Sequence, residues 1–343
     1  MGFDGLPLTI AWELTLACNL RCRHCASAAG VIRSDELTLQ ECLSVCDQLP
    51  DLLVRECDFT GGEPLMRADW PIIAARLVQF GITTQIITNA VALDADAVRQ
   101  MVDVGISGVG FSVDGLGPTH DSIRMRPGLF DRIVKGIHMV EAAELPATVI
   151  TTATALNLDE LPELLRALHG AGVRRWQIQP IFPVGRGKTH AELHLTNEAY
   201  LRLGSIARQL ASDGKSLGVE VGVADSCGYF TELDTREIPW RGCPAGRVSL
   251  GIASNGDIKG CLSLPDELVE GNIRERTLWD IWFDSTSFRY NREVGVAGPN
   301  CRGCEEFEVC GGGCAAMSHG CTGRFHDNPY CFKGIRQRLA VPA

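Results

Sequence analysis

Short apolar runs and amphipathic stretches alternate along the first two-thirds of this 343-residue chain, and this alternation most constrains its fold. The apolar runs have the length and composition of buried parallel strands, and the stretches between them have helical spacing. Six strand–helix units in a row predict an α/β fold with a parallel sheet, either an incomplete barrel or a doubly wound sheet. We expect strands over residues 8–16, 56–60, 83–88, 109–113, 147–152 and 176–181, and helices over residues 39–49, 70–80, 94–104, 130–143, 161–168 and 197–212.

The alternation ends after Val223, where short glycine- and cysteine-rich segments follow. Helical spacing returns only over residues 278–288. Because these segments contain few apolar residues, we expect bound metal to stabilise their fold. We therefore predict a first domain over residues 1–216 and a second, cysteine-rich domain over residues 217–343.

The chain contains 15 cysteines, and nine of them lie between Cys227 and Cys331. The N-terminus lacks the basic segment of a signal peptide, and no apolar run is as long as a membrane span. We therefore predict a cytoplasmic protein, in which clustered thiols indicate metal binding or catalysis rather than disulfides. The net charge of −10 and the lack of a basic tract argue against nucleic acid as a partner.

Cys18, Cys22 and Cys25 form a CX3CX2C motif directly after the first predicted strand. In a parallel barrel, the loops at the carboxyl ends of the strands carry the chemistry. A four-iron cluster normally takes four cysteines, so three thiolates leave one iron open to another molecule. The alternative is a zinc site with His24 as the fourth ligand, although zinc usually takes paired ligands from two separated segments.

This motif resembles the cluster-binding motif of the radical S-adenosylmethionine (SAM) superfamily. The resemblance implies a partial (β/α)6 barrel with a [4Fe–4S] cluster whose open iron binds the amino and carboxylate groups of SAM. It further implies that reduction cleaves SAM to methionine and a 5′-deoxyadenosyl radical, which abstracts a hydrogen atom from the substrate.

A second motif, Gly61-Gly62-Glu63, ends the second predicted strand and is similar to the family's GGE motif. The resemblance implies that this motif contacts the amino group of SAM. Glycines let the backbone approach a ligand closely, and the Glu63 carboxylate can accept hydrogen bonds from an ammonium group.

Ser112 and Asp114 end the fourth predicted strand, where the family contacts the ribose and carboxylate of SAM. Arg124 follows ten residues later and could pair with the SAM carboxylate. Three further polar residues also end strands and either line the site or only form caps and turns: Asn89, Thr152 and Gln179.

The C-terminal cysteines resemble the SPASM extension of radical SAM enzymes, which carries two auxiliary [4Fe–4S] clusters. The spacing is CX17C, with Gly256 five residues before the second cysteine, then CX2CX5CX3C and a final cysteine after a gap. The resemblance implies one ligand set of Cys243, Cys261 and Cys314 and another of Cys301, Cys304, Cys310 and Cys331. Paired zinc knuckles are the alternative, since thiolates alone do not distinguish the two metals.

Cys227 and Cys321 fall outside this pattern. Cys227 is our candidate for completing the first auxiliary cluster, as an upstream cysteine does in some SPASM proteins. Otherwise that cluster has an open iron that could bind substrate. Either Cys227 or Cys321 could instead donate a hydrogen atom to a substrate radical, as in peptide epimerases, and Cys321 could also be a free thiol without a catalytic role.

Enzymes similar to this one mostly modify peptides or proteins, so the resemblance implies a peptide maturase that crosslinks, epimerises, decarboxylates or oxidises a ribosomally made precursor. The alternatives are a small-molecule enzyme similar to those of haem synthesis, a sulfatase-modifying enzyme, and a non-catalytic iron–sulfur or zinc scaffold. The implied partners are a peptide or protein substrate, a separate leader-binding protein, and an electron donor of the flavodoxin or ferredoxin type.

Overall fold

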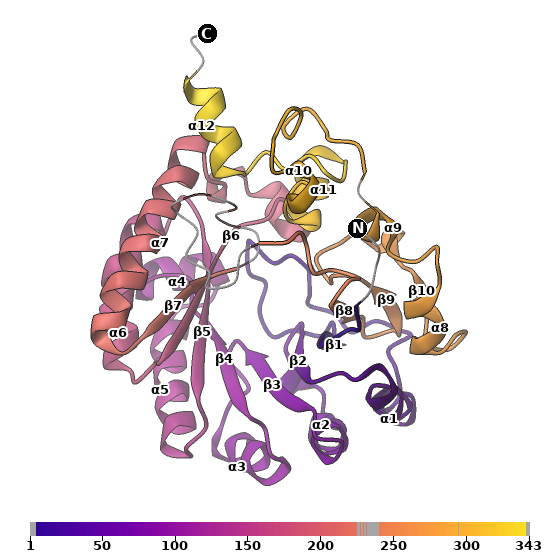
Figure 1. Cartoon of the computed structure of the whole chain (residues 1–343). Coiled ribbons are helices and arrows are strands. Elements are labelled where there is room, and N and C mark those ends of the chain that lie inside the picture. Colours follow the sequence, from indigo (N-terminus) through magenta and orange to yellow (C-terminus); the bar gives the residue numbers. More distant parts are fainter. Residues whose placement is uncertain are drawn as a thin grey trace.

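A computed structural model describes residues 5–224, 227, 229, 231, 240–293 and 295–340. In that part of the chain, ten strands form one sheet in the order β10-β9-β8-β1-β2-β3-β4-β5-β6-β7 (Figure 1). The strands are β1 Thr9–Thr15, β2 Glu56–Gly61, β3 Thr83–Thr88, β4 Gly108–Ser112, β5 Ala147–Ala153, β6 Arg175–Pro180, β7 Glu220–Val223, β8 Ser249–Ile252, β9 Asp257–Lys259 and β10 Gly271–Asn272. The helices are α1 Leu39–Gln48, α2 Trp70–Gln79, α3 Ala95–Val104, α4 Gly117–Arg124, α5 Leu129–Ala142, α6 Leu161–Gly170, α7 Asn197–Leu217, α8 Leu278–Phe283, α9 Arg289–Arg292, α10 Phe307–Cys310, α11 Ala315–Thr322 and α12 Phe332–Ala340.

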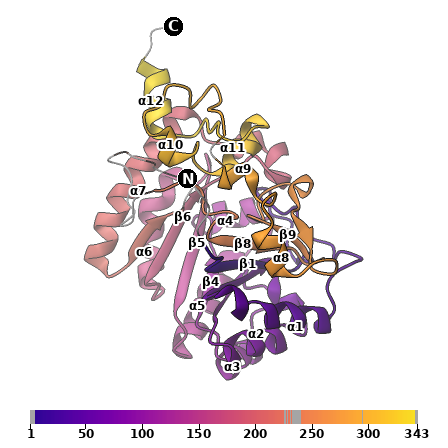
Figure 2. The same cartoon turned by 45° about the vertical axis from the view of Figure 1, so that its right-hand side comes forward.

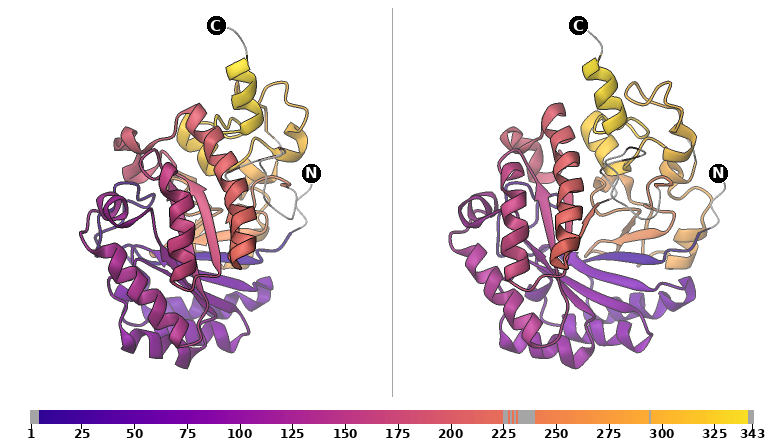
Figure 3. Two further views of the ribbon diagram at one scale, coloured as in Figure 1. Left: turned by 90° about the vertical axis from the view of Figure 1, so that its left-hand side faces the viewer. Right: turned by 60° about the vertical axis from the view of Figure 1, so that its left-hand side comes forward.

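The first six strands and their helices confirm the predicted α/β alternation. Strands β1 to β7 are all parallel, and each pairs with the next one along the chain. Helices follow the outer side of the curved sheet, and the C-terminal region, orange to yellow, lies in the upper part of the molecule (Figure 3). This arrangement is a partial barrel. None of the helices in the described ranges has the length and apolar character needed to cross a bilayer.

The sheet continues across the expected domain boundary at residue 217. β7 lies beyond that position and pairs with β6. On the other side, β8 pairs in parallel with β1 from Thr9↔Ser249 to Trp12↔Ile252, so the cysteine-rich region adds to the sheet beside the first strand (Figure 2). The division into residues 1–216 and 217–343 stays a prediction.

The helix expected over residues 278–288 is wrong as one element, because the chain forms α8 and α9 with a break between them. Oδ1 of Asp284 accepts hydrogen bonds from the backbone and hydroxyl of Thr286, which favours a turn over helix continuation. Phe288 then adopts a left-handed conformation with φ of 57°. Side chains that compete for backbone hydrogen bonds are hard to detect from apolar spacing alone.

Side chains of β1 alternate between two environments. Ile10, Trp12 and Leu14 belong to the buried core, where Trp12 meets Phe59 edge to face at 6.1 Å between ring centroids. Because successive residues of a strand point to opposite faces, Glu13 faces the interior of the partial barrel. The apolar face therefore anchors the strand, and the other face is free to carry chemistry.

Replacing Trp12 by Ala should reduce the free energy of unfolding by about 3–5 kcal/mol, since the change leaves a large cavity under β1. Trp279→Ala is the matched control, because Trp279 is 49% exposed on α8, and its loss should cost less than about 1 kcal/mol. Urea unfolding of the iron-loaded protein under anaerobic conditions measures both. Equal losses in the two variants would contradict this assignment of the core.

Candidate functional site

The loop after β1 brings the three cysteines of the first motif together. Burial raises the pKa of the Cys22 thiol to about 11, and Cys18 and Cys25 are close enough to act on it electrostatically. Nη1 of Arg124 lies 4.0 Å from Sγ of Cys22. A guanidinium there compensates for negative charge on the sulfur, so the site suits thiolates or an anionic cluster.

A cavity opens beside these thiols at the ends of the first four strands. Of the residues predicted to contact SAM, Gly61, Gly62, Ser112 and Arg124 are on its wall, and so is Asn89, whose Nδ2 lies 3.6 Å from Sγ of Cys18. The complete lining is Cys18, Cys22, His24, Cys25, Ala29, Thr60, Gly61, Gly62, Ile87, Thr88, Asn89, Ser112, Arg124 and Arg186.

The glycine turn after β2 is hydrogen-bonded to the start of the cysteine loop. The Gly62 and Glu63 amides donate to the carbonyls of Thr15 and Ala17, both at 2.8 Å. A Cβ atom on Gly62 would lie 2.1 Å from the Ala17 carbonyl oxygen, which no side chain can tolerate. Glycine is therefore required here for the close approach of two loops, in addition to any contact with a ligand.

Glu63 is held by hydrogen bonds within the protein, and its expected contact with SAM stays a prediction. It lies behind the cavity wall, fully buried, and its Oε1 accepts hydrogen bonds from the Thr88 hydroxyl and the Leu65 amide. Oε2 accepts one from the Asn89 amide at 2.8 Å. Burial raises the pKa of this carboxyl group to about 7. In this structure Glu63 holds the ends of β2 and β3 in place.

Asp114 likewise lies behind the cavity, where it positions two residues of the wall. Its Oδ2 is 2.7 Å from Nε of Arg124 and 3.2 Å from Nε2 of His24. Its Oδ1 accepts a hydrogen bond from the Thr152 amide. Although burial opposes ionisation, Arg124 and His24 hold the pKa of Asp114 well below its usual range. Nε2 of His24 is thus committed to this carboxylate, whereas its Nδ1 is buried without a hydrogen-bond partner among the described residues.

Arg186 belongs to the site but sequence reasoning missed it. Its Nε donates to the Cys22 carbonyl and its Nη1 to the Ala29 carbonyl, both at 2.8 Å, so it braces the cysteine loop from the segment after β6. The sequence offered only Gly187-Lys188-Thr189, which resembles the end of a phosphate-binding loop but has Phe182 where that motif needs its first glycine. Because Arg186 and Cys22 are more than 150 residues apart in the sequence, no local sequence pattern indicates this contact.

The cysteines of the second cluster form two groups in space that match the implied ligand sets. In the first group, a hydrogen bond with the Cys243 thiol raises the pKa of Cys314, and Cys261 adds to the effect. In the second group, four thiols line one small cavity: Cys301, Cys304, Cys310 and Cys331.

The four thiols of the second group share one space. Throughout the ranges that the structure describes, no three His, Cys, Asp or Glu side chains converge as one metal ion would require. Four thiols around a shared space, of which burial raises the pKa of Cys301 to about 11 and that of Cys310 to about 12, suit a cluster of several irons. The donor set therefore fits iron–sulfur clusters.

The two remaining cysteines lie in separate places. Cys227 is buried and hydrogen-bonded to the hydroxyl of Tyr200, whose pKa is raised by burial and then by Cys227, Cys331 and Cys314. Cys321 lies on α11, and its Sγ is 3.6 Å from the sulfur of Met317. Their roles as ligand or hydrogen donor stay predictions.

Thr152 and Gln179 are linked to each other at the ends of β5 and β6. Nε2 of Gln179 lies 3.5 Å from Oγ1 of Thr152, whose amide donates to Asp114. Both residues therefore belong to the layer that supports the wall.

Family models match both parts of the chain. The model of the radical SAM superfamily matches residues 12–178, and that of the iron–sulfur cluster-binding SPASM domain matches residues 243–305. The AdoMet-dependent heme synthase of Methanosarcina barkeri is 30% identical, and the match covers 96% of this chain and 98% of that protein. The mycofactocin maturase MftC of Mycolicibacterium smegmatis is 31% identical, and the match covers 92% of this chain and 79% of that protein. The PqqA peptide cyclase of Granulibacter bethesdensis is 27% identical, covering 92% and 84%.

Solved structures share the fold over nearly the whole chain. Streptococcus suis SuiB bound to S-adenosylmethionine has a TM-score of 0.76 at 18% identity, covering 96% of this chain and 76% of that one. The enzyme anSMEcpe with bound AdoMet has a TM-score of 0.75 at 15% identity, covering 97% and 96%.

Gly62→Ala should lower the rate of SAM cleavage by at least about 100-fold, because the methyl group pushes the glycine turn away from the cysteine loop. Gly170→Ala, at the exposed end of α6, meets no atom within 4 Å and should leave the rate unchanged. Release of 5′-deoxyadenosine after reduction with dithionite measures both rates. Full activity in Gly62→Ala would show that this close approach does not matter.

Proposed function

Because this chain belongs to the radical SAM superfamily and carries a SPASM domain, we propose that it is a peptide maturase that abstracts a hydrogen atom from a ribosomally made precursor. It is an enzyme, and its cofactors are SAM, the [4Fe–4S] cluster that binds SAM, and auxiliary iron–sulfur clusters. The outcome on the peptide is a crosslink, an epimerisation, a decarboxylation or an oxidation.

The thiols have a division of labour in this proposal. Cys18, Cys22 and Cys25 hold the SAM-binding cluster, which when reduced supplies the electron that splits SAM and thereby starts radical chemistry. Two sets hold the auxiliary clusters: Cys243, Cys261 and Cys314, and Cys301, Cys304, Cys310 and Cys331.

In this proposal, the other residues that line the cavity bind SAM and orient it. Gly61 and Gly62 would contact the amino group of SAM and Ser112 would contact its ribose, and all three residues line the cavity. Arg124 pairs with the SAM carboxylate through its terminal nitrogens, since its Nε is already held by Asp114.

The chemistry of a neighbouring cavity supports the choice of a peptide. This cavity, of about 600 Å³, lies between the cysteine loop, the segment after β6 and the cysteine-rich region. Its described lining is rich in charged and backbone groups, including Glu13, Arg33 and Lys259, and contains no Phe, Tyr or Trp. A flat macrocycle would need broad apolar walls, whereas a peptide main chain needs donors and acceptors.

The second candidate is a small-molecule activity similar to that of the heme synthases. Its support is the end-to-end match with the Methanosarcina barkeri protein, which covers 98% of that relative, compared with 79% of MftC. The basic side chains of the cavity could then bind carboxylate groups of the substrate.

A separate leader-binding protein and a flavodoxin- or ferredoxin-type electron donor complete the proposal. We place the reaction in the cytoplasm, where 15 cysteines stay reduced and available for clusters.

The test is anaerobic turnover with each class of substrate. The reconstituted, reduced enzyme should convert a short peptide encoded beside its gene, giving 5′-deoxyadenosine together with a peptide of changed mass or, after an epimerisation, of changed chromatographic retention. An iron porphyrin carrying propionate groups is the competing substrate in parallel reactions. Loss of propionate carboxyl groups, with the peptide untouched, would replace the first candidate by the second.

Replacing Cys18, Cys22 and Cys25 together by Ala should abolish 5′-deoxyadenosine formation while the auxiliary iron remains. Cys46→Ala is the control, because its thiol is buried under α1 and contacts the Ile73 carbonyl away from the site. Iron analysis and Mössbauer spectra report how many clusters each variant keeps. Cleavage that persists in the triple variant, or loss of all iron from it, would refute this division of labour.

A further inference from the structure

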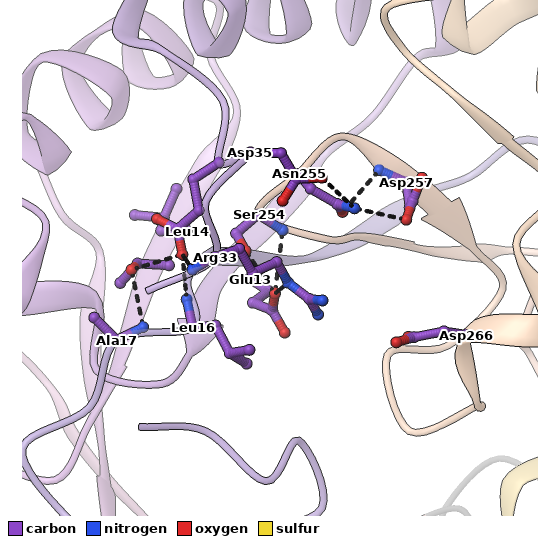
Figure 4. Close-up of polar contacts among 12 residues, drawn as sticks. Glu13, Leu14, Leu16, Ala17, Arg33, Asp35, Ser254, Asn255, Asp257 and Asp266 are labelled. Carbon is purple, nitrogen blue, oxygen red and sulfur yellow. Dashed lines mark hydrogen bonds and ion pairs between the residues drawn. The ribbon is translucent and has the colours of Figure 1, made fainter. Parts of the chain in front are cut away.

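The cavity of about 600 Å³ contains a buried carboxylate that the proposed chemistry does not use. Glu13 lies near the end of β1, faces the interior of the barrel and is only 3% exposed. Its Oε1 accepts three hydrogen bonds, from the amide and hydroxyl of Ser254 at 3.2 and 2.8 Å and from Nε of Arg33 at 3.3 Å (Figure 4). Within the described structure Oε2 accepts none, although the residue lines the cavity.

Oε2 of Glu13 is therefore an acceptor on the wall of the cavity that lacks a donor among the described residues, so a ligand in the cavity can supply one. The Glu13 side chain has room because the residue packed against it is a glycine. Gly61 stands directly behind it, and a Cβ atom there would lie 2.8 Å from Cγ of Glu13. Ser254, from the turn after β8, fixes the orientation of the carboxylate, so the cysteine-rich region determines which oxygen faces the cavity.

Arg33 supplies the complementary groups. Among the described residues only its Nε has a side-chain partner, Glu13, and its two terminal nitrogens point past the carboxylate toward the side where Asp266 lies (Figure 4). Its side chain is 24% exposed. An acceptor and a set of donors therefore lie side by side, and their charges compensate each other.

We infer that Glu13 and Arg33 form a subsite for one residue of an extended peptide main chain, with the N–H of that residue on Oε2 of Glu13 and its C=O on the Arg33 guanidinium. A neutral amide matches this pair better than an ion does, because the pair itself has no net charge. The inference rests on the proposed function and specifies how that substrate is held.

The subsite borders the cavity that contains the cysteine triad. Ala26 and Gly185 line the cavity that contains Glu13, and their chain neighbours Cys25 and Arg186 line the cavity of the cysteine triad. A peptide held at Glu13 would thus extend along the wall that separates it from the radical-generating site. This placement positions a neighbouring residue of the peptide for hydrogen abstraction.

Glu13→Gln tests the subsite with little disturbance of the fold. The amide oxygen of Gln should stay with the donors of Ser254 and Arg33. Its NH2 group would then take the place of Oε2 and face the N–H of the peptide, so that two donors would meet. Arg33→Met removes the other half of the pair. Glu267→Gln is the matched control, since Glu267 is exposed and lines the same cavity without a role in this subsite.

The probe is capped tetra-alanine, acetylated and N-methylamidated, because it offers a main chain and no charged group. Its dissociation constant for the iron-loaded, SAM-bound enzyme is measured by saturation-transfer NMR. We expect binding about tenfold weaker in Glu13→Gln and Arg33→Met, the loss of roughly one hydrogen bond to a charged group, and unchanged binding in Glu267→Gln. The same peptide with N-methylated alanines should bind the wild type as weakly as Glu13→Gln binds the unmodified probe.

Three results would overturn the inference. These are no binding of the probe to the wild type, equal binding to the wild type and Glu13→Gln, and displacement of the probe by propionate at similar concentration, which would make Arg33 a carboxylate site. Binding of SAM must be unchanged in each variant. Turnover of the gene-encoded peptide is scored separately, so this subsite can fail while the peptide maturase assignment stands, and the reverse holds as well.

Discussion

The parallel pairing of β1 with β2 is the constraint on which the rest of the site depends. The two strands run in register up to Glu13↔Thr60, after which the register shifts so that Thr15 pairs with Gly61. This shift brings the glycine turn within hydrogen-bonding distance of the cysteine loop, where Gly62 tolerates no side chain. It also leaves Glu13 facing the neighbouring cavity, which has a volume of about 600 Å³. One local irregularity of the sheet therefore positions both cavities.

Buried charges organise the next layer, and each of them is paired. Asp114 is fully buried yet contacts Arg124, His24 and the Thr152 amide. A lone charge there would be strongly destabilising, whereas a hydrogen-bonded pair can be tolerated and fixes geometry. The guanidinium of Arg124 is held between this carboxylate and the sulfur of Cys22, so the charge needed beside the thiols is in place before any ligand binds.

The cysteine-rich region contributes more than its own thiols. β8 pairs with the free edge of β1, and the turn after it brings Ser254 to the Glu13 carboxylate. The same region supplies Lys259 and Asp266 to the wall of the larger cavity. The part of the chain that holds the auxiliary thiols thus also shapes the space next to the SAM-binding cavity, which explains why the two regions share one sheet.

The sequence alone determined the six strand–helix units and the grouping of the thiols. Apolar periodicity is a local property, and ligand spacings such as CX3CX2C are read directly along the chain. It also placed Gly61, Gly62 and Ser112 at strand ends, because parallel strands present their carboxyl ends at one edge. It failed where competition between side chain and backbone breaks a helix, as at Asp284.

Only the tertiary structure decided which polar residues face a cavity and which support the wall. Asp114 and Glu63 lie behind the cavity of the cysteine triad because their partners come from neighbouring strands and helices. Arg186 reaches Cys22 across more than 150 residues, and Ser254 reaches Glu13 across more than 200. These contacts depend on strand order and register, which fix distances in space between residues whose separation along the chain carries no such information.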